Sequence, residues 1–402
     1  MAQACSLLSR FRGCLAGAVI GDCVGDKFES KWADSIAMVR IIHEDKKIRE
    51  AAEKRKKANE NADGEISNGE IWTFTDDTAM ARSVARSLIE HKGFNARDMA
   101  RRFTEEYFNE RFRGYGGSVT VVFQKLQETE YENPFEPAKK QFEGEGSYGN
   151  GGAMRIAPAG LFGYKDNDFH RLRDLAEDIT KITHSHYQAI QGAVLQAYAV
   201  DLALRVEGHL DADEFLNDLI KQMKLLEQEA ERITIYYERR NEKTITRDSG
   251  EERSTASEHP YCDKLEKIKT FLKQEAPPSP QEINEELGTD VAALESVPAA
   301  IFAFLYATKD IPYLENRNLF EKTVMYAISL GGDTDTIATM AAAIAGACYG
   351  EEQLPEHWKL CCEGVDDALE DAEQLYNLSQ SSNTQPPGSD TKFKIYERGS
   401  LN

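Results

Sequence analysis

An alanine-rich stretch toward the C-terminal end, residues 337–348, carries no charge and no polar face, so as a helix it must be buried on all sides. Directly before it, residues 331–336 read Gly-Gly-Asp-Thr-Asp-Thr. Two carboxylates at the start of a buried helix are costly unless positive charge meets them. The helix N-terminus supplies part of that compensation, and a divalent cation that prefers oxygen ligands could supply the rest. The run therefore predicts a buried helical core with an ion site at its edge.

A second acidic run lies far upstream, Thr75-Asp76-Asp77-Thr78, and it also begins an apolar helical segment. A Thr or Asp before such a helix is most often a simple N-cap that satisfies free backbone N–H groups. One cap needs only one side chain, whereas residues 333–336 bring several polar groups together. Taken jointly, the two runs predict one shared, binuclear metal site. Oxygen ligands without His or Cys favour Mg²⁺, with Mn²⁺ as a substitute.

Helical periodicity dominates the rest of the chain and predicts an all-α fold, because the alternating β-branched runs typical of strands are nearly absent. Small residues recur through 13–21 and 338–347, which suits the close approach of two helices in one compact core. The segments predicted to be helical are 5–25, 77–92, 96–109, 118–129, 170–182, 188–206, 211–231, 263–274, 282–288, 291–307, 317–329, 336–349 and 365–378.

The predicted folded domain spans residues 1–378, with polar insertions at about 44–70 and 233–260. Residues 379–402 are rich in Ser, Asn, Gln and Pro, a composition typical of a disordered tail. A chain of 402 residues is long enough to bury a sizeable core. We expect a monomer.

The formal net charge of −21 argues against direct binding to nucleic acid or to a membrane surface. No apolar stretch reaches membrane-spanning length, and the N-terminus has no signal-peptide organisation. The seven cysteines are scattered and lack zinc-site spacing, which is typical of reduced thiols inside the cell. We therefore expect a cytosolic or nuclear protein.

A glycine-rich run covers residues 142–155. Three of its glycines match the spacing of a dinucleotide-binding fingerprint, but no buried strand precedes them, so we interpret the match as coincidence. Successive glycines still allow backbone N–H groups to line a nest for phosphate oxygens. Phe142 and Tyr148 offer rings on which an adenine could stack. Anion binding is favoured over the alternative, a flexible surface loop. The glycines in question are Gly144, Gly146 and Gly149.

Three isolated features are weaker candidates. Glu29 follows a glycine-rich turn after the first helix and could act as a general acid or base, although most exposed glutamates have no such role. His184 and His186 form a pair with no third ligand nearby, so hydrogen bonding or packing is favoured over metal ligation. The turn at 113–118 is also rich in glycine and could border the same cleft.

Together these motifs resemble the ADP-ribosylglycohydrolase family over about residues 5–375. The two acidic runs carry the family likeness, with Gly-Cys-Leu-Ala-Gly-Ala at 13–18 leading to Gly-Asp at 21–22. The runs 146–155 and 295–298 are similar to the branch that removes ADP-ribose from serine. The resemblance implies a single multi-helix domain with a binuclear Mg²⁺ centre at the base of an ADP-ribose cleft.

The resemblance also implies a role for each matching residue. Glu29 would act in acid/base catalysis from a mobile flap over the metals, although the long insertion before Thr75 departs from the family's spacing. The implied metal ligands are Thr75, Asp76, Asp77 and Asp335 for one ion, and Asp333, Asp335 and Thr336 for the other. The implied substrate-binding residues are Gly116, Gly117, Phe142, Gly146, Ser147, Tyr148, Gly149, Asn150 and His184.

The implied reaction is hydrolysis of the bond that joins C1″ of ADP-ribose to serine in a modified protein. The resemblance extends the substrates to poly(ADP-ribose) and O-acetyl-ADP-ribose, and the location to nucleus, cytoplasm and mitochondrial matrix. Two alternatives remain: a hydrolase specific for ADP-ribosyl-arginine, and a catalytically silent protein that only binds ADP-ribose. The complete set of acids favours an enzyme, because buried carboxylates are costly and a site without activity would not require them.

Overall fold

The computed structural model describes residues 5–29, 37–60, 71–241 and 257–381. Within these ranges the regular structure consists of α-helices and short 3₁₀ turns, and the β pairing is limited to two isolated bridges. The predicted all-α fold is therefore confirmed. Among the described residues, no helix combines the length and apolarity needed to cross a membrane.

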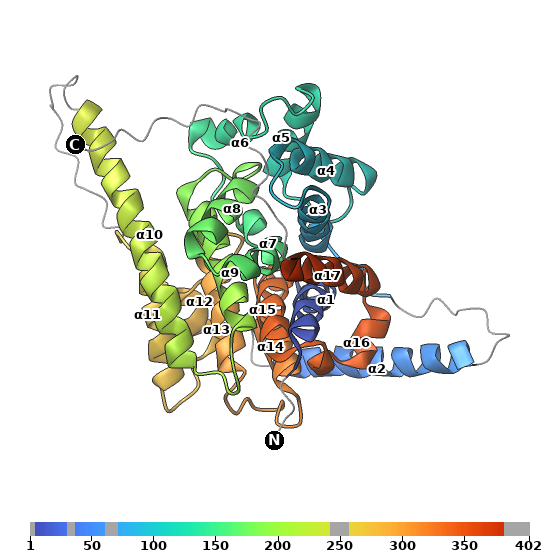
Figure 1. The fold of residues 1–402 in the computed structure, drawn as a ribbon. Coiled ribbons are helices and arrows are strands. Elements are labelled where there is room, and N and C mark those ends of the chain that lie inside the picture. Colours follow the sequence, from blue (N-terminus) through green and yellow to red (C-terminus); the bar gives the residue numbers. More distant parts are fainter. Residues whose placement is uncertain (1–4, 30–36, 61–70, 242–256, 382–402) are drawn as a thin grey trace.

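Two helices, α1 (Leu7–Gly25) and α15 (Thr334–Tyr349), form the centre of the molecule (Figure 1). They run antiparallel with their backbones in direct contact, because α1 turns a row of glycines toward α15. A Cβ atom added to Gly21 would lie 2.3 Å from the carbonyl oxygen of Ala338. One added to Gly25 would lie 2.5 Å from the Cα of Asp335. The close approach predicted from small residues is confirmed, and it fixes the start of α15 against the end of α1.

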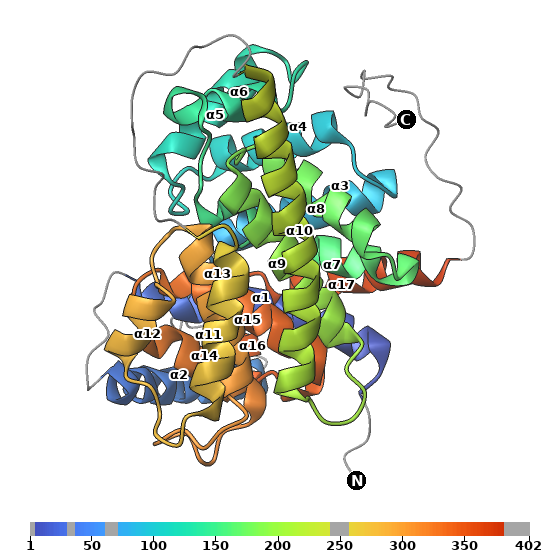
Figure 2. The ribbon, with the colours of Figure 1, turned by 90° about the vertical axis from the view of Figure 1, so that its left-hand side faces the viewer.

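The other helices surround this pair. Those packed directly around it are α7 (Ala157–Gly163), α9 (Tyr187–Leu204), α13 (Ala293–Tyr306), α14 (Leu319–Ser329) and α17 (Val365–Gln380). One flank consists of α8 (Phe169–Lys181), α10 (Ala212–Asn241), α11 (Pro260–Lys273) and α12 (Pro280–Glu286). Figure 2 shows α10 and α11 side by side on this flank. The remaining helices are α2 (Ala37–Glu60), α3 (Asp76–His91), α4 (Ala96–Asn109), α5 (Gly117–Glu128), α6 (Glu136–Lys139) and α16 (Glu356–Cys361).

Each segment predicted to be helical contains a helix, with ends shifted by a few residues in most cases. The prediction for 211–231 was too short, because α10 continues to Asn241 and so enters the expected insertion at 233–260. Four helices were missed, namely α2, α6, α7 and α16. Of the expected insertions and tail, 61–70, 242–256 and 382–402 lie outside the described residues.

The missed helix α2 covers residues 44–60 of the segment that the sequence suggested to be an insertion. Ile48 is 1 % exposed there, and the carboxylate of Asp45 is buried between His357 (2.8 Å) and Arg317 (2.7 Å). This part of the segment is thus packed onto α14 and α16. Its apolar face is narrow, and the surrounding charges hid the helical pattern.

Candidate active site

The two acidic runs meet at the adjacent starts of α3 and α15. The hydroxyl of Thr336 donates to Oδ2 of Asp77 across 3.3 Å, which joins one run to the other. Asp77 and Asp335 each keep a buried carboxylate oxygen, Oδ1, for which the described part of the chain supplies no hydrogen-bond partner. Carboxylate oxygens buried without a donor are costly, so their presence together indicates a place for a cation.

The end of η1 (Asp26–Phe28) brings a further carboxylate to this cluster. One oxygen each of Glu29, Asp333 and Asp335 lie within 4.8 Å of one another. Glu29 is itself exposed, unlike the two aspartates. It therefore stands at the boundary between the buried acids and solvent, where a group that exchanges protons with water is useful. The expected flap that follows Glu29 includes residues 30–36, which lie outside the described residues.

A glycine pair turns the chain between α14 and α15 and so sets the position of the second acidic run, residues 333–336. Gly331 and Gly332 have φ of +74° and +75°, the left-handed region that side chains disfavour. A Cβ on Gly332 would also lie 2.0 Å from the carbonyl oxygen of Thr289. The same carbonyl accepts a hydrogen bond of 2.8 Å from the backbone N–H of Asp333. The turn thus requires glycine for space as well as for conformation.

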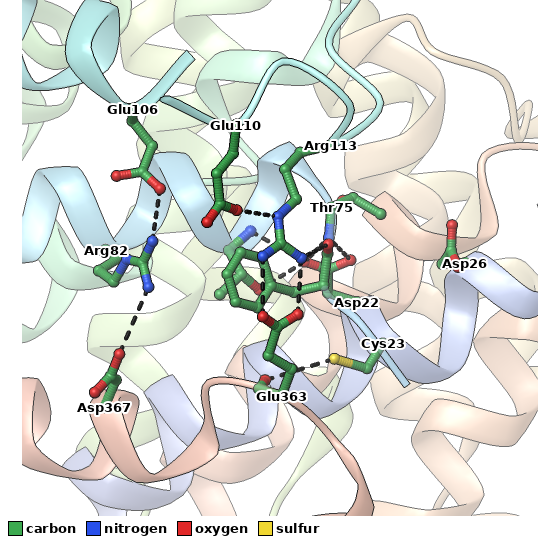
Figure 3. Close-up of polar contacts among 12 residues, drawn as sticks. Asp22, Cys23, Asp26, Thr75, Arg82, Glu106, Glu110, Arg113, Glu363 and Asp367 are labelled. Carbon is green, nitrogen blue, oxygen red and sulfur yellow. Dashed lines mark hydrogen bonds and ion pairs between the residues drawn. The ribbon is translucent and has the colours of Figure 1, made fainter. Parts of the chain in front are cut away.

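Asp22, in α1, holds the start of α3 in place (Figure 3). Its buried carboxylate accepts from the backbone N–H of Thr75 at 3.0 Å, the N–H of Thr78 at 3.0 Å and the hydroxyl of Thr78 at 2.6 Å. In the sequence, Asp22 belongs to the run that carries the family likeness, and no role was predicted for it. Its signal was available: an acid on a helix whose other neighbouring residues are small or apolar needs a buried partner.

Arg113 supports the same segment from its outer side (Figure 3). Its guanidinium group forms a bidentate ion pair with Glu363, with N–O distances of 2.7 and 2.9 Å. It also donates to the carbonyl oxygen of Phe74 at 2.9 Å, and its central carbon lies 3.8 Å from the centre of the Phe74 ring. The backbone carbonyl of Arg113 accepts from the N–H of Asp76 at 2.7 Å. These contacts fix residues 74–76 between α1 and the C-terminal helices.

We expect Arg113→Lys to lower the free energy of unfolding by about 2 kcal/mol, since a lysine cannot form the bidentate pair or stack as a plane on Phe74. Urea denaturation measures this directly. The matched control is Arg171→Lys, at a guanidinium that is 71 % exposed and loosely paired with Asp168. It should change stability by less than about 0.5 kcal/mol. Equal effects at the two positions would contradict the bracing role of Arg113.

Burial dominates the electrostatics of the cluster. It raises the pKa of Asp76 and of Asp335 to about 8, and the charge of Asp335 adds to the rise at Asp76. The pKa of Asp77 is raised well above its usual range for the same two reasons. An acid whose pKa is raised on folding stabilises the fold at low pH and loses that contribution as the pH rises through the raised value. As the pH rises through about 8 these acids become charged, so binding of a positive ion is then favoured most.

A cavity of about 310 Å³ opens beside the acids. The structure places these predicted site residues on its walls: Glu29, Asp76, Asp77, Gly116, Phe142, Ser147, Tyr148, Gly149, Asn150, His184, Asp333, Asp335 and Thr336. Three others do not line it. Thr75 is the N-cap of α3, Gly117 is the first residue of α5, and Gly146 packs against Ser185. The turn at 113–118 contributes to the rim, as the sequence suggested.

The glycine-rich run is joined to the acidic cluster by Asn150. Its side-chain amide donates to Oδ2 of Asp333 at 2.5 Å and to the hydroxyl of Ser296 at 3.1 Å. Its backbone N–H donates to the carbonyl oxygen of Val291 at 2.9 Å. Phe142 and Tyr148 line the cavity while remaining about half exposed, at 53 % and 50 %. One wall thus carries backbone turns and aromatic rings, and the base carries carboxylates.

Several other residues line the cavity without a predicted role, although four of them lie within the runs at 113–118 and 142–155. They are Met80, Gly151, Tyr115, Val119, Phe123, Met154, Arg155 and Val291. Arg155 differs from the rest because it is a cation with 1 % exposure. Burial lowers the pKa of Arg155 to about 9, with the charge of Asp76 acting in the opposite direction, so the guanidinium stays charged at neutral pH. A lone arginine in an apolar stretch could have been singled out on that ground.

Comparison with known proteins places the chain in a family. The family model described as "ADP-ribosylglycohydrolase" matches residues 4–385. The chain is 40% identical to "ADP-ribosylhydrolase ARH3" of Bos taurus over 95% of this chain and 96% of that protein. The corresponding protein of Homo sapiens is 40% identical over 93% and 95%. A solved structure titled "ADP-ribosylglycohydrolase-related protein complex" shares the fold, with a TM-score of 0.59 at 21% identity, covering 93% of this chain and 99% of that one. The chain therefore belongs to the ADP-ribosylglycohydrolase family.

Proposed function

We propose that this protein is a Mg²⁺-dependent hydrolase that releases ADP-ribose from modified serine residues by cleaving the O-glycosidic bond at C1″. The observation that carries the proposal is the link between the glycine-rich wall and the acidic base through Asn150 and Asp333. A ligand with a purine and a diphosphate at one end would bind the glycine-rich wall, and ribose hydroxyls at its other end would lie at the acidic base. Relatives called ADP-ribosylhydrolase, at 40% identity along nearly the whole chain, support the same substrate class.

The oxygen donors at the starts of α3 and α15 fit a pair of hard divalent cations. The residues that would hold them are Thr75, Asp76, Asp77, Asp333, Asp335 and Thr336. All offer oxygen, and two of the carboxylates have a buried oxygen that the described residues leave unpartnered. When bound, Mg²⁺ would supply positive charge that orients ribose hydroxyls and lowers the pKa of a coordinated water. Mn²⁺ has the same ligand preference and is the expected substitute.

The protein's own groups would do the remaining work. Glu29 can exchange a proton with the leaving oxygen or with the attacking water, since it stands between the acids and solvent. Burial, then the charges of Asp335 and Asp26, raise the pKa of Glu29, which moves it toward the range useful for acid/base catalysis. The walls that carry Phe142 and Tyr148 hold the adenine end, so that C1″ lies over the base of the cavity.

We expect Glu29→Gln to lower kcat by about 10²–10⁴-fold, because the amide occupies the same space but transfers no proton at neutral pH. Thermal stability, and its increase on adding Mg²⁺, should stay close to those of the unchanged protein, since Glu29 is exposed. Steady-state kinetics and a thermal melt with and without Mg²⁺ test both parts. A variant with full activity would exclude Glu29 as the proton-transfer group.

The proposed function is tested by incubating the protein with two peptides that carry ADP-ribose on serine or on arginine. We expect ADP-ribose to be released from the serine peptide with Mg²⁺, and release to stop with a chelator and return with excess Mg²⁺ or Mn²⁺. Release from the arginine peptide alone would instead support an arginine-specific hydrolase. Thermal stabilisation by ADP-ribose without turnover of either peptide would support a silent binding protein.

The same bond cleavage extends to poly(ADP-ribose), whose units are joined through an oxygen on C1″, and to O-acetyl-ADP-ribose when the acetyl group is on that oxygen. Both belong in the same assay as additional substrates. We further propose that the protein acts as a monomer in the nucleus, the cytoplasm and the mitochondrial matrix.

A further inference from the structure

A buried polar chain, in which Arg155 and Thr183 have no predicted role, reaches the cavity from behind the glycine-rich wall. It begins at Arg155, whose guanidinium carbon lies 4.2 Å from the centre of the Phe103 ring. It continues through Thr183, which is 0 % exposed, to His184, which is 8 % exposed. Arg155 and His184 line the cavity, while Thr183 stands between them.

The distances define one continuous run of hydrogen bonds. Nη2 of Arg155 donates to Oγ1 of Thr183 at 2.7 Å, and the same oxygen lies 2.7 Å from Nδ1 of His184. Nη2 also donates to the carbonyl oxygen of Ile179 at 3.3 Å, so the guanidinium is anchored to α8. The hydroxyl of Thr183 therefore lies between an anchored guanidinium group and the ring of His184.

The donors and acceptors in this run decide which nitrogen of His184 carries the proton. A guanidinium group can only donate, so Thr183 must accept from Arg155. The hydroxyl proton of Thr183 is then free to point at Nδ1 of His184, which accepts it. With the reverse arrangement, Nδ1–H would donate to the threonine oxygen and leave a buried hydroxyl proton without an acceptor among the described residues. Buried polar groups are rarely left unpaired, so Nδ1 is the acceptor and the proton resides on Nε2.

The other edge of the ring faces the glycine-rich wall. A Cβ on Gly151 would lie 2.6 Å from Cε1 and 3.0 Å from Nε2 of His184, and one on Gly149 would lie 3.6 Å from Nε2. These glycines leave the space through which the ring nitrogen reaches a ligand.

We infer that Arg155 and Thr183 are positioning residues that fix His184 as the neutral Nε2–H tautomer, so that this N–H donates to an oxygen of the bound ADP-ribose. The inference rests on the proposed function for the identity of the ligand. Burial, then the charge of Arg155, lower the pKa of His184 to about 3, which agrees with a ring that remains neutral. A neutral donor with a set direction binds a ligand oxygen without adding charge beside a metal site.

The tautomer can be read without any turnover, by two-dimensional proton–nitrogen spectra of protein labelled at its eight histidines. His184→Gln assigns the signals of His184. We expect the unchanged protein and Thr183→Ser to show the Nε2–H tautomer, because serine keeps the hydroxyl. Thr183→Val has nearly the same shape without the hydroxyl, and it should show the Nδ1–H form or a mixture. An Nδ1–H ring in the unchanged protein, or no change in Thr183→Val, would overturn the inference.

Kinetics of the same variants connect the tautomer to the ligand. We expect Thr183→Val to raise KM by about tenfold, equivalent to the loss of one oriented hydrogen bond, with a smaller change in kcat. Thr183→Ser should restore KM to within about twofold of the unchanged protein. A changed tautomer with unchanged KM would refute the contact with ADP-ribose. If the unchanged protein turned over no ADP-ribosyl substrate, the proposed function would fail, while the spectra would still decide the tautomer.

Discussion

Replacing Asp335 by Asn should reduce turnover by at least about 100-fold while leaving the metal-free protein as stable as the unchanged one, or more stable. Asp335 is buried among Asp76, Asp77 and Asp333, and its charge raises the pKa of the first two. Removing one charge relieves the repulsion among these acids, which the charge of Arg155 and the hydrogen bond from Asn150 to Asp333 offset only in part. At about pH 8 we expect a gain of about 1–3 kcal/mol in the free energy of unfolding without metal.

Addition of Mg²⁺ should reverse this order. The unchanged protein should gain about 2.7 kcal/mol at a Mg²⁺ concentration 100 times its dissociation constant, and Asp335→Asn should gain much less. Chemical denaturation with chelator and with Mg²⁺ separates the two effects. The control is Asp201→Asn, a buried acid paired with Arg205 at 2.7 and 2.9 Å and remote from the cavity lining. It should lose stability in both conditions and keep the full response to Mg²⁺. A response to Mg²⁺ that survives in Asp335→Asn would remove this residue from the metal site.

The elements that could be predicted from the sequence are those whose pattern is local. The helix after Asp333 has apolar residues on every side, and α9 is nearly as uniform, so both are evident without a structure. Helix α2 was missed because Ile41, Ile48 and Ala52 form a narrow face among charges. Its stability depends on α14 and α16, which lie far away in the sequence.

In the candidate site, too, the features with a local pattern could be predicted and those that depend on distant packing could not. Two acidic runs at two helix starts share one chemistry, so their association could be inferred from composition and spacing. The partners of Asp22 and Arg113 could not, because a hydrogen bond to Thr78 or an ion pair with Glu363 depends on how distant helices pack. Arg155 and Thr183 are separated by 28 residues, and nothing local in either segment indicates that they touch.

Gly21→Ala should be among the most destabilising substitutions in the chain, although alanine is the better helix former by about 1 kcal/mol. The added Cβ would lie 2.3 Å from the carbonyl oxygen of Ala338 and 2.6 Å from its carbon. Both atoms belong to the backbone of α15, so no side chain can rotate away. The two central helices must separate, and we expect a loss of about 3 kcal/mol or more in the free energy of unfolding.

The matched control is Gly117→Ala, at the first residue of α5, where an added Cβ meets nothing within 4 Å. Its stability should stay the same or rise by up to about 1 kcal/mol, as helix propensity alone predicts. Urea denaturation of both variants gives the comparison, and equal stabilities would show that α1 and α15 are not in backbone contact. Gly21→Ala should also weaken the response to Mg²⁺ in whatever protein stays folded. The same contact row ends with Gly25 against Asp335, so a helix pair forced apart also moves the acids that would hold the cation.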